Sequence, residues 1–181
     1  MSHPPGQKML SRLLGFGIFL FYSFFSSLAL ADFEDDYETK QWQELAVQLP
    51  APPKDETLVS FYVSPTSDSR FLIDTATLTV GADGVVRYVL VIDAAGGARN
   101  VTYEGMRCES RERRIYASGR RDGGWSKSRV NEWVRIQEAH MNRQHAALFL
   151  EYFCPEGSIV FSASEAIRAL RQGGHPTTKR Y

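Results

Sequence analysis

The run from Val85 to Ile92 constrains the fold most strongly, because every position in it except Arg87 is apolar or aromatic. A strand that is apolar on both faces needs cover on both faces of its sheet. The run follows Gly81-Ala82-Asp83-Gly84, residue types that tolerate positive φ and favour a hairpin. The pattern therefore predicts a central strand with other parts of the chain packed on each side.

Further strands are expected around this run. β-branched and aromatic residues predict a strand over 58–63, and polar–apolar alternation predicts strands over 76–80 and 100–108. A shorter strand is expected over 114–118, before the turn Asp122-Gly123-Gly124. Short turns join these segments, which is typical of an antiparallel meander.

The last third of the chain changes to a helical period. Apolar residues recur at positions i, i+3, i+4 and i+7 and predict a helix over 142–153: Ala146, Phe149, Leu150 and Phe153. A strand over 148–154 is the alternative. Ser162 and Glu165 have the spacing of a capping box, and Gly173 suits the position just past a second helix. Strands first and helices last indicate an α+β fold, an antiparallel meander with two C-terminal helices packed on one face.

The N-terminus has the layout of a secretory signal peptide over residues 1–31. Lys8 and Arg12 precede an apolar run, which ends in Ala29-Leu30-Ala31. An uncleaved anchor is the alternative, since the run approaches the ~20 residues that span a bilayer. Cleavage predicts a periplasmic or secreted protein with no permanent membrane span.

Composition divides the remaining chain. Residues 32–57 form an acidic arm with a Pro-rich linker, 58–173 a single domain, and 174–181 a flexible tail. Loosely helical spacing of aromatic residues in the arm allows a short docked helix. The chain has 21 basic and 21 acidic residues, and loss of Lys8 and Arg12 leaves a net charge of −2. Nucleic acid is not expected as a partner, because nucleic-acid-binding domains are usually clearly basic.

Two cysteines, Cys108 and Cys154, lie in the predicted mature chain. An exported chain meets an oxidising compartment, so a Cys108–Cys154 disulfide is expected, joining the sheet to the first helix. A metal pair or a catalytic thiol is disfavoured, because the cysteines lack C-x-x-C spacing. No cofactor motif is present.

A set of motifs occurs along the chain in the segments 83–89, 100–108, 116–119, 142–148 and 152–155. In this order the motifs resemble the cryptic-neisserial-protein-like family of exported beta-proteobacterial proteins. The resemblance covers about Leu49 to Gly173 and implies an envelope or periplasmic domain of uncharacterised function. It supplies no catalytic or ligand-binding residues. Some members look like lipoproteins, whereas this chain lacks a cysteine at the cleavage site.

Basic residues gather between Arg107 and Arg129, where eight basic residues face three acidic ones. Guanidinium groups bind anions in bidentate fashion, so this region is a candidate surface for an envelope protein or anionic envelope component. A solvated hairpin is one alternative. Pairing with the acidic arm, within one molecule or in a homo-oligomer, is another. The candidate binding residues are Arg111, Arg113, Arg114, Arg120, Arg121 and Trp125.

An enzymatic alternative is a small hydrolase or glycan-acting enzyme that uses Glu104, Glu109 and His145. A structural salt bridge or simple exposure is favoured for Glu104, and His145 is expected either to form a buried hydrogen bond or to lie at the helix surface. His140 and His145 are five residues apart and would not share a helix face, so no metal site is expected. Without a catalytic motif, the chain is expected to be a non-enzymatic exported binding domain.

Overall fold

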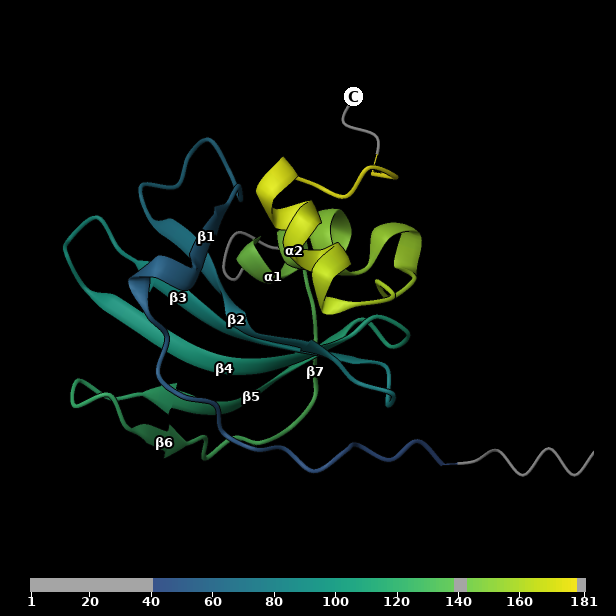
Figure 1. Cartoon of the computed structure of the whole chain (residues 1–181), viewed down its shortest axis with the longest axis horizontal. Helices are drawn as coiled ribbons and strands as arrows, with labels where there is room; N and C mark the ends of the chain where they lie inside the picture. Colours follow the sequence, from purple (N-terminus) through teal and green to yellow (C-terminus); the bar gives the residue numbers. More distant parts are fainter. Residues whose placement is uncertain (1–40, 139–142, 179–181) are drawn as a thin grey trace, which may run out of the picture. The chain divides into compact units, whose positions relative to one another are not determined.

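The computed structural model describes residues 41–138 and 143–178, in which one antiparallel sheet carries helices on one face (Figure 1). Each strand from β1 to β5 pairs with the next one, and β7 also pairs with β5. The strands are β1 (Leu58–Phe61), β2 (Arg70–Val80), β3 (Val85–Asp93), β4 (Arg99–Arg107), β5 (Glu112–Gly119), β6 (Trp125–Lys127) and β7 (Val134–Arg135). The predicted α+β class and antiparallel meander are confirmed.

The central position of β3 is also confirmed. Val85, Val86, Tyr88, Val89 and Val91 are all 0% exposed. Alternate residues point to opposite faces, so Val86 and Tyr88 pack in one apolar cluster while Val89 and Val91 pack in another. The first cluster lies beneath the helices. The second lies on what we call the open face of the sheet.

Strand β2 begins before the expected 76–80 segment and contains a bulge. The pairing register shifts between Asp74 and Thr79. Inside the bulge, Asp74 Oδ1 accepts a hydrogen bond from Ala76 N at 3.1 Å, and Thr77 Oγ1 donates to Asp74 O at 3.2 Å. These local bonds are typical of a turn, yet the strand continues through them because both halves pair with β3.

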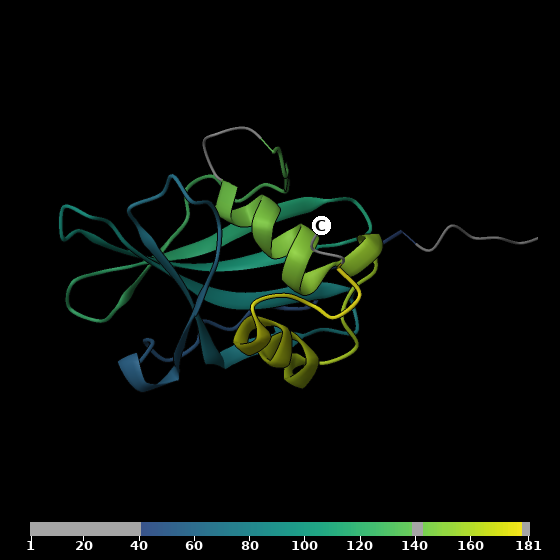
Figure 2. The same ribbon diagram turned by 90° about the horizontal axis from the view of Figure 1, so that it is seen from above.

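The helical layer consists of α1 (Arg143–Ala147), η2 (Leu148–Phe153), η3 (Pro155–Gly157) and α2 (Ala163–Gln172), which lie over one sheet face (Figure 2). The segment η2 is a π-helix, and Cys154 N donates to Phe149 O, five residues earlier. The wider turn shifts the buried face. Leu150, expected to be buried, is therefore 44% exposed, while Tyr152 is 0% exposed. The alternative strand over 148–154 does not form.

The second helix has the predicted ends. Ser162 Oγ accepts from Glu165 N at 3.2 Å, while Glu165 Oε2 accepts from Phe161 N at 2.7 Å. Gly173 follows the helix with φ 73°. Beyond it, in the segment expected to be a flexible tail, His175 N donates to Glu151 O at 2.7 Å and the His175 side chain contacts Glu165. His175 is thus held on the helical layer, while Pro176 and Thr177 beyond it are exposed.

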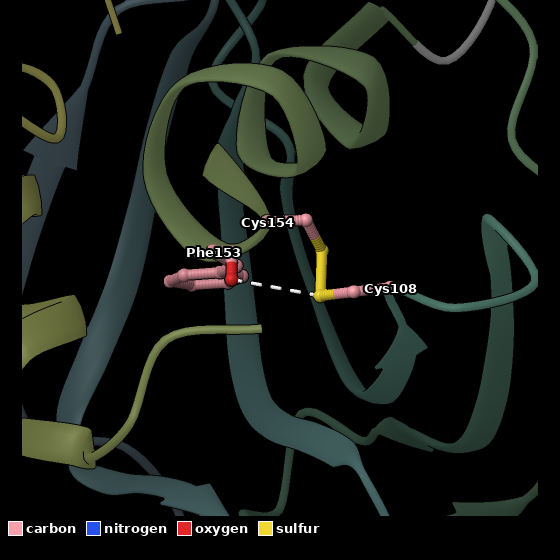
Figure 3. The surroundings of a disulfide bond; sticks show 3 residues. All are labelled: Cys108, Phe153 and Cys154. Atoms are coloured by element: carbon pink, nitrogen blue, oxygen red, sulfur yellow. Dashed lines mark hydrogen bonds between the residues drawn. A yellow bond between two sulfur atoms is a disulfide. The ribbon is translucent and has the colours of Figure 1, made fainter. Parts of the chain in front are cut away.

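The expected Cys108–Cys154 disulfide is present and joins the two layers (Figure 3). Cys108 follows β4 directly and Cys154 follows η2, and their Cα atoms are 5.4 Å apart. Cys108 Sγ lies 3.5 Å from Phe153 O, a contact without a hydrogen bond because a disulfide sulfur carries no proton. The bond closes a chain separation of 46 residues and holds the helical layer against the sheet.

Candidate functional site

The open face of the sheet is crossed by residues 41–54, which we call the N-terminal segment (Figure 1). The segment has no regular secondary structure before the short 3-10 helix η1 (Asp55–Thr57), so its described part does not form the short helix considered from the sequence. Trp42, Glu44, Val47 and Pro50 are half-buried, and the residues between them are exposed. The segment therefore holds to the sheet through a few spaced side chains.

Glu44 is the charged anchor of this segment. Its carboxylate pairs with the Arg114 guanidinium, accepts a hydrogen bond from Tyr116 Oη at 2.5 Å, and lies 3.6 Å from Arg87 Nη2. Burial, together with the bond to Glu44, raises the pKa of Tyr116, so its hydroxyl stays protonated as the donor. One acidic side chain thus contacts groups on β5 and on β3, which lie on either side of β4.

Asp83, in the hairpin between β2 and β3, provides a second anchor. Its carboxylate accepts hydrogen bonds from Nη1 and Nη2 of Arg87, at 3.1 and 2.5 Å, and from Leu45 N at 2.8 Å. Burial opposes ionisation of Asp83, but the bonds from Arg87 and Leu45 outweigh it and lower its pKa. Gly81 leaves room for this pair, since a Cβ there would lie 2.2 Å from Asp83 Oδ1.

Trp42 lies on the open face between the Arg107 guanidinium and the Trp133 ring. Its indole Nε1 donates to Asp83 O at 2.7 Å, and the Arg107 guanidinium lies 3.7 Å from its ring centroid. The Trp133 ring meets it edge-on, with centroids 5.8 Å apart. Arg107 is thus engaged by the N-terminal segment rather than by Glu104, which lies on the helix side.

The Pro-rich end of the segment contacts β6. Trp125 Nε1 donates to Pro50 O at 2.8 Å, and the Trp125 ring packs beside Tyr103 with centroids 6.3 Å apart. Gly105 allows Tyr116 to fill the neighbouring space, because a Cβ at Gly105 would lie 2.2 Å from the Tyr116 hydroxyl. Trp125, expected to face a partner, here binds the chain's own backbone.

Two cavities lie beside the N-terminal segment. One of about 330 Å³ is lined by Leu45, Val47 and Leu49 of the segment and by Arg114, Lys127 and Asn131 of the sheet side. The other, of about 570 Å³, lies between the Pro-rich stretch and the β2 bulge, with Asp74 and Tyr103 in its wall. Both volumes fall within the range of small-ligand sites. The segment therefore covers the open face without filling it.

The arginines predicted to form one binding surface are divided between different places. Arg114 pairs with Glu44 on the open face, whereas Arg111 pairs with Glu138 at 2.5 Å and lies over the Phe149 ring of η2. Arg113 is half-buried beside Arg114 in β5. Exposed cations of this run remain at the β5–β6 turn, in β6 and just after β6: Arg120, Arg121, Lys127 and Arg129.

Glu104 and His145 meet beneath the helices. His145 Nε2 lies 2.8 Å from Glu104 Oε2, and Glu104 also accepts from Tyr88 Oη and Thr102 Oγ1 at 3.2 and 2.7 Å. Burial opposes ionisation of Glu104, but the charge and hydrogen bond of His145 outweigh it and lower its pKa. Of the two alternatives for His145, the buried hydrogen bond is confirmed.

The third residue of the enzymatic alternative lies elsewhere. The Glu109 side chain is 87% exposed and lies 3.7 Å from Arg107, whereas those of Glu104 and His145 are 2% and 4% exposed. Neither cavity described above is lined by Glu104 or His145. The three residues are thus not gathered at one accessible site.

Residues 41–138 and 143–178 hold no group of three His, Cys, Asp or Glu side chains suited to a metal ion. Nor does any helix in this part of the chain have the length and apolar character to cross a bilayer. His140 and the predicted signal peptide lie outside the described residues.

The architecture defines an α+β domain whose meander sheet is covered by helices on one face and by an extended segment on the other. The model of the CNP1-like family matches residues 37–171, and the chain belongs to this family. The match begins before β1 and includes the described N-terminal segment, so the segment is part of the family's domain. Searches of curated proteins and of solved structures gave no match.

Proposed function

We propose that this protein is a non-enzymatic binding domain of the bacterial cell envelope, exported to the periplasm, and that it holds an anionic envelope component. The observation that carries the proposal is the group of exposed cations in and just after the β5–β6 hairpin: Arg120, Arg121, Lys127 and Arg129. Arg120 has only a surface contact with Asp122, in which the side chains are 56% and 66% exposed. Such a pair stabilises little, so Arg120 remains available to an anionic ligand.

Export is supported by two features of different kinds. The first 31 residues have the layout of a signal peptide, and the domain contains a disulfide, which persists in oxidising compartments. Cell fractionation followed by intact-mass measurement tests the proposed location and the cleavage of the signal peptide. The expected product is a periplasmic chain that begins at Asp32. A cytoplasmic chain that keeps residues 1–31 and two free thiols would contradict export.

The binding surface is tested by in-cell crosslinking of the tagged full chain, followed by mass spectrometry. The variant Arg120→Ser/Arg121→Ser should lose the captured anionic component, because two exposed cations are removed without disturbing an anchored side chain. The matched control is Arg70→Ser/Arg168→Ser, which removes two exposed charges from β2 and α2. Equal capture by both variants would rule out the hairpin as the binding surface.

A further inference from the structure

The N-terminal segment lies on the open face in the manner of a bound peptide. Residues 41–53 pair with no strand, and their hydrogen bonds join them to residues 38 to 75 positions later in the chain. These contacts use side chains or single backbone groups: Trp42 to Asp83, Leu45 to Asp83, Glu44 to Arg114 and Tyr116, and Trp125 to Pro50. None of them requires a covalent connection between the segment and the sheet.

The chemistry of the groove matches a recurrent mode of peptide recognition. Proline-rich segments dock in aromatic grooves, where their extended backbone is pre-organised and its carbonyls accept hydrogen bonds. Here Trp125 donates to the carbonyl of Pro50, with Tyr103 beside it. At the other end, Arg114 and Arg107 face a carboxylate and an indole. The groove thus recognises a peptide in which an aromatic residue and an acidic residue are followed by proline.

The chain's own segment leaves part of this groove unused. Cavities of about 330 and 570 Å³ lie beside Val47 and beside Ala51. The indole Nε1 of Trp133, next to Trp42, is buried and has no hydrogen-bond partner among the described residues. Lys127 lines the first cavity and makes no ion pair in the described part of the chain. A bulkier peptide with a further acceptor would satisfy groups that the segment does not.

From these features we infer that the open face is a peptide-binding groove for an extended, acidic, proline-containing segment of a partner protein, and that the N-terminal segment occupies it until the partner displaces it. The tethered segment competes at a high effective concentration, of order mM for a short linker, so a free peptide binds weakly to the closed form. The inference does not depend on export or on the exposed cations in and just after the β5–β6 hairpin.

The probe is a fluorescent peptide with the sequence of residues 41–54, added to the purified chain and followed by anisotropy. The closed wild-type chain should bind it weakly. The variant Trp42→Ala/Glu44→Gln loosens the tethered segment and should bind it at least tenfold more tightly. Glu44→Gln alone, which preserves side-chain size, serves as a second variant that keeps the fold if the double variant does not. Equal affinity of the wild-type chain and of the folded variant would overturn the inference.

Two variant peptides test which residues of the peptide the groove recognises. A peptide with Glu44→Lys places a cation opposite Arg114 and should not bind the loosened variant. A peptide with Ala51→Leu extends toward the larger cavity and should bind several-fold more tightly. Binding of the charge-reversed peptide at the original affinity would overturn the assignment. If the loosened variant formed a dimer in the absence of peptide, the inference would also be overturned, because the groove would then bind the N-terminal segment of a second copy.

Discussion

The two faces of the sheet are covered in different ways. The helix face is sealed by η2 and α2, by a disulfide and by the buried hydrogen bond between Glu104 and His145, and its apolar cluster contains nineteen of the described residues. The open face has a cluster of five, Leu72, Val89, Val91, Tyr103 and Tyr116, beneath a segment without regular structure. Stability is therefore concentrated on one face, and the other is suited to exchange of its cover.

The largest effect is expected for His145→Leu on the helix face. The change leaves the buried Glu104 carboxylate without its His145 partner, which costs about 3–5 kcal/mol of unfolding free energy. Urea denaturation followed by circular dichroism measures this loss. The double variant Glu104→Gln/His145→Leu removes the uncompensated charge and should recover part of the stability. If the double variant were no more stable than the single one, charge would not explain the effect.

The same pair predicts a pH dependence. The pKa of Glu104 is lowered below its ordinary value of 4.5, so the folded state holds this proton less tightly than the unfolded chain does. The stabilisation is fully present above pH 4.5 and declines as the pH falls through the lowered pKa. Denaturation at several pH values should show this decline in the wild-type chain and a smaller one in Glu104→Gln. Parallel curves would contradict the assignment.

Loss of the disulfide is expected to have the next largest effect. Cys108→Ser/Cys154→Ser releases the 46-residue separation and should cost about 2–4 kcal/mol, mainly through greater freedom of the unfolded chain. Thermal unfolding of the variant and of the reduced wild-type chain should agree. Two free thiols in the native oxidised protein would contradict the disulfide itself.

The smallest effect is expected on the open face. Trp125→Phe keeps an aromatic ring beside Tyr103, although a smaller one, and removes the indole donor to Pro50, a hydrogen bond worth about 1 kcal/mol. Hydrogen exchange should show faster exchange at Leu45 and its neighbours while β3 amides stay protected. A comparable loss of protection in β3 would mean that the two faces open together, and would remove the contrast between them.

Local sequence patterns were sufficient for most of the sheet. Alternation and hairpin residues located β3, β4 and β5, and the capping box located α2. The first half of β2 was missed because Asp74, a residue typical of turns, makes turn-like bonds inside a strand. The short strands β6 and β7 were missed because each exists only through pairing with the edge of β5.

Side-chain placement was harder to predict because it depends on distant partners. The charge run between Arg107 and Arg129 was evident, but alternation along β5 and its neighbours divides the arginines between two faces. Glu44 was one of several acidic residues in the arm, and nothing local marked it as the partner of Arg114, 70 positions away. Leu150 was misplaced because the π-helix changes the helical period within the segment.

The position of the N-terminal segment also bears on the order of folding. A ribosome delivers this segment before any of the strands that hold it, and Trp125 emerges 75 residues after Pro50. Contacts of such long separation carry a large loop-closure cost and form late. The part of the domain that is made first is therefore among the last to find its place, and until then β3 has an uncovered side.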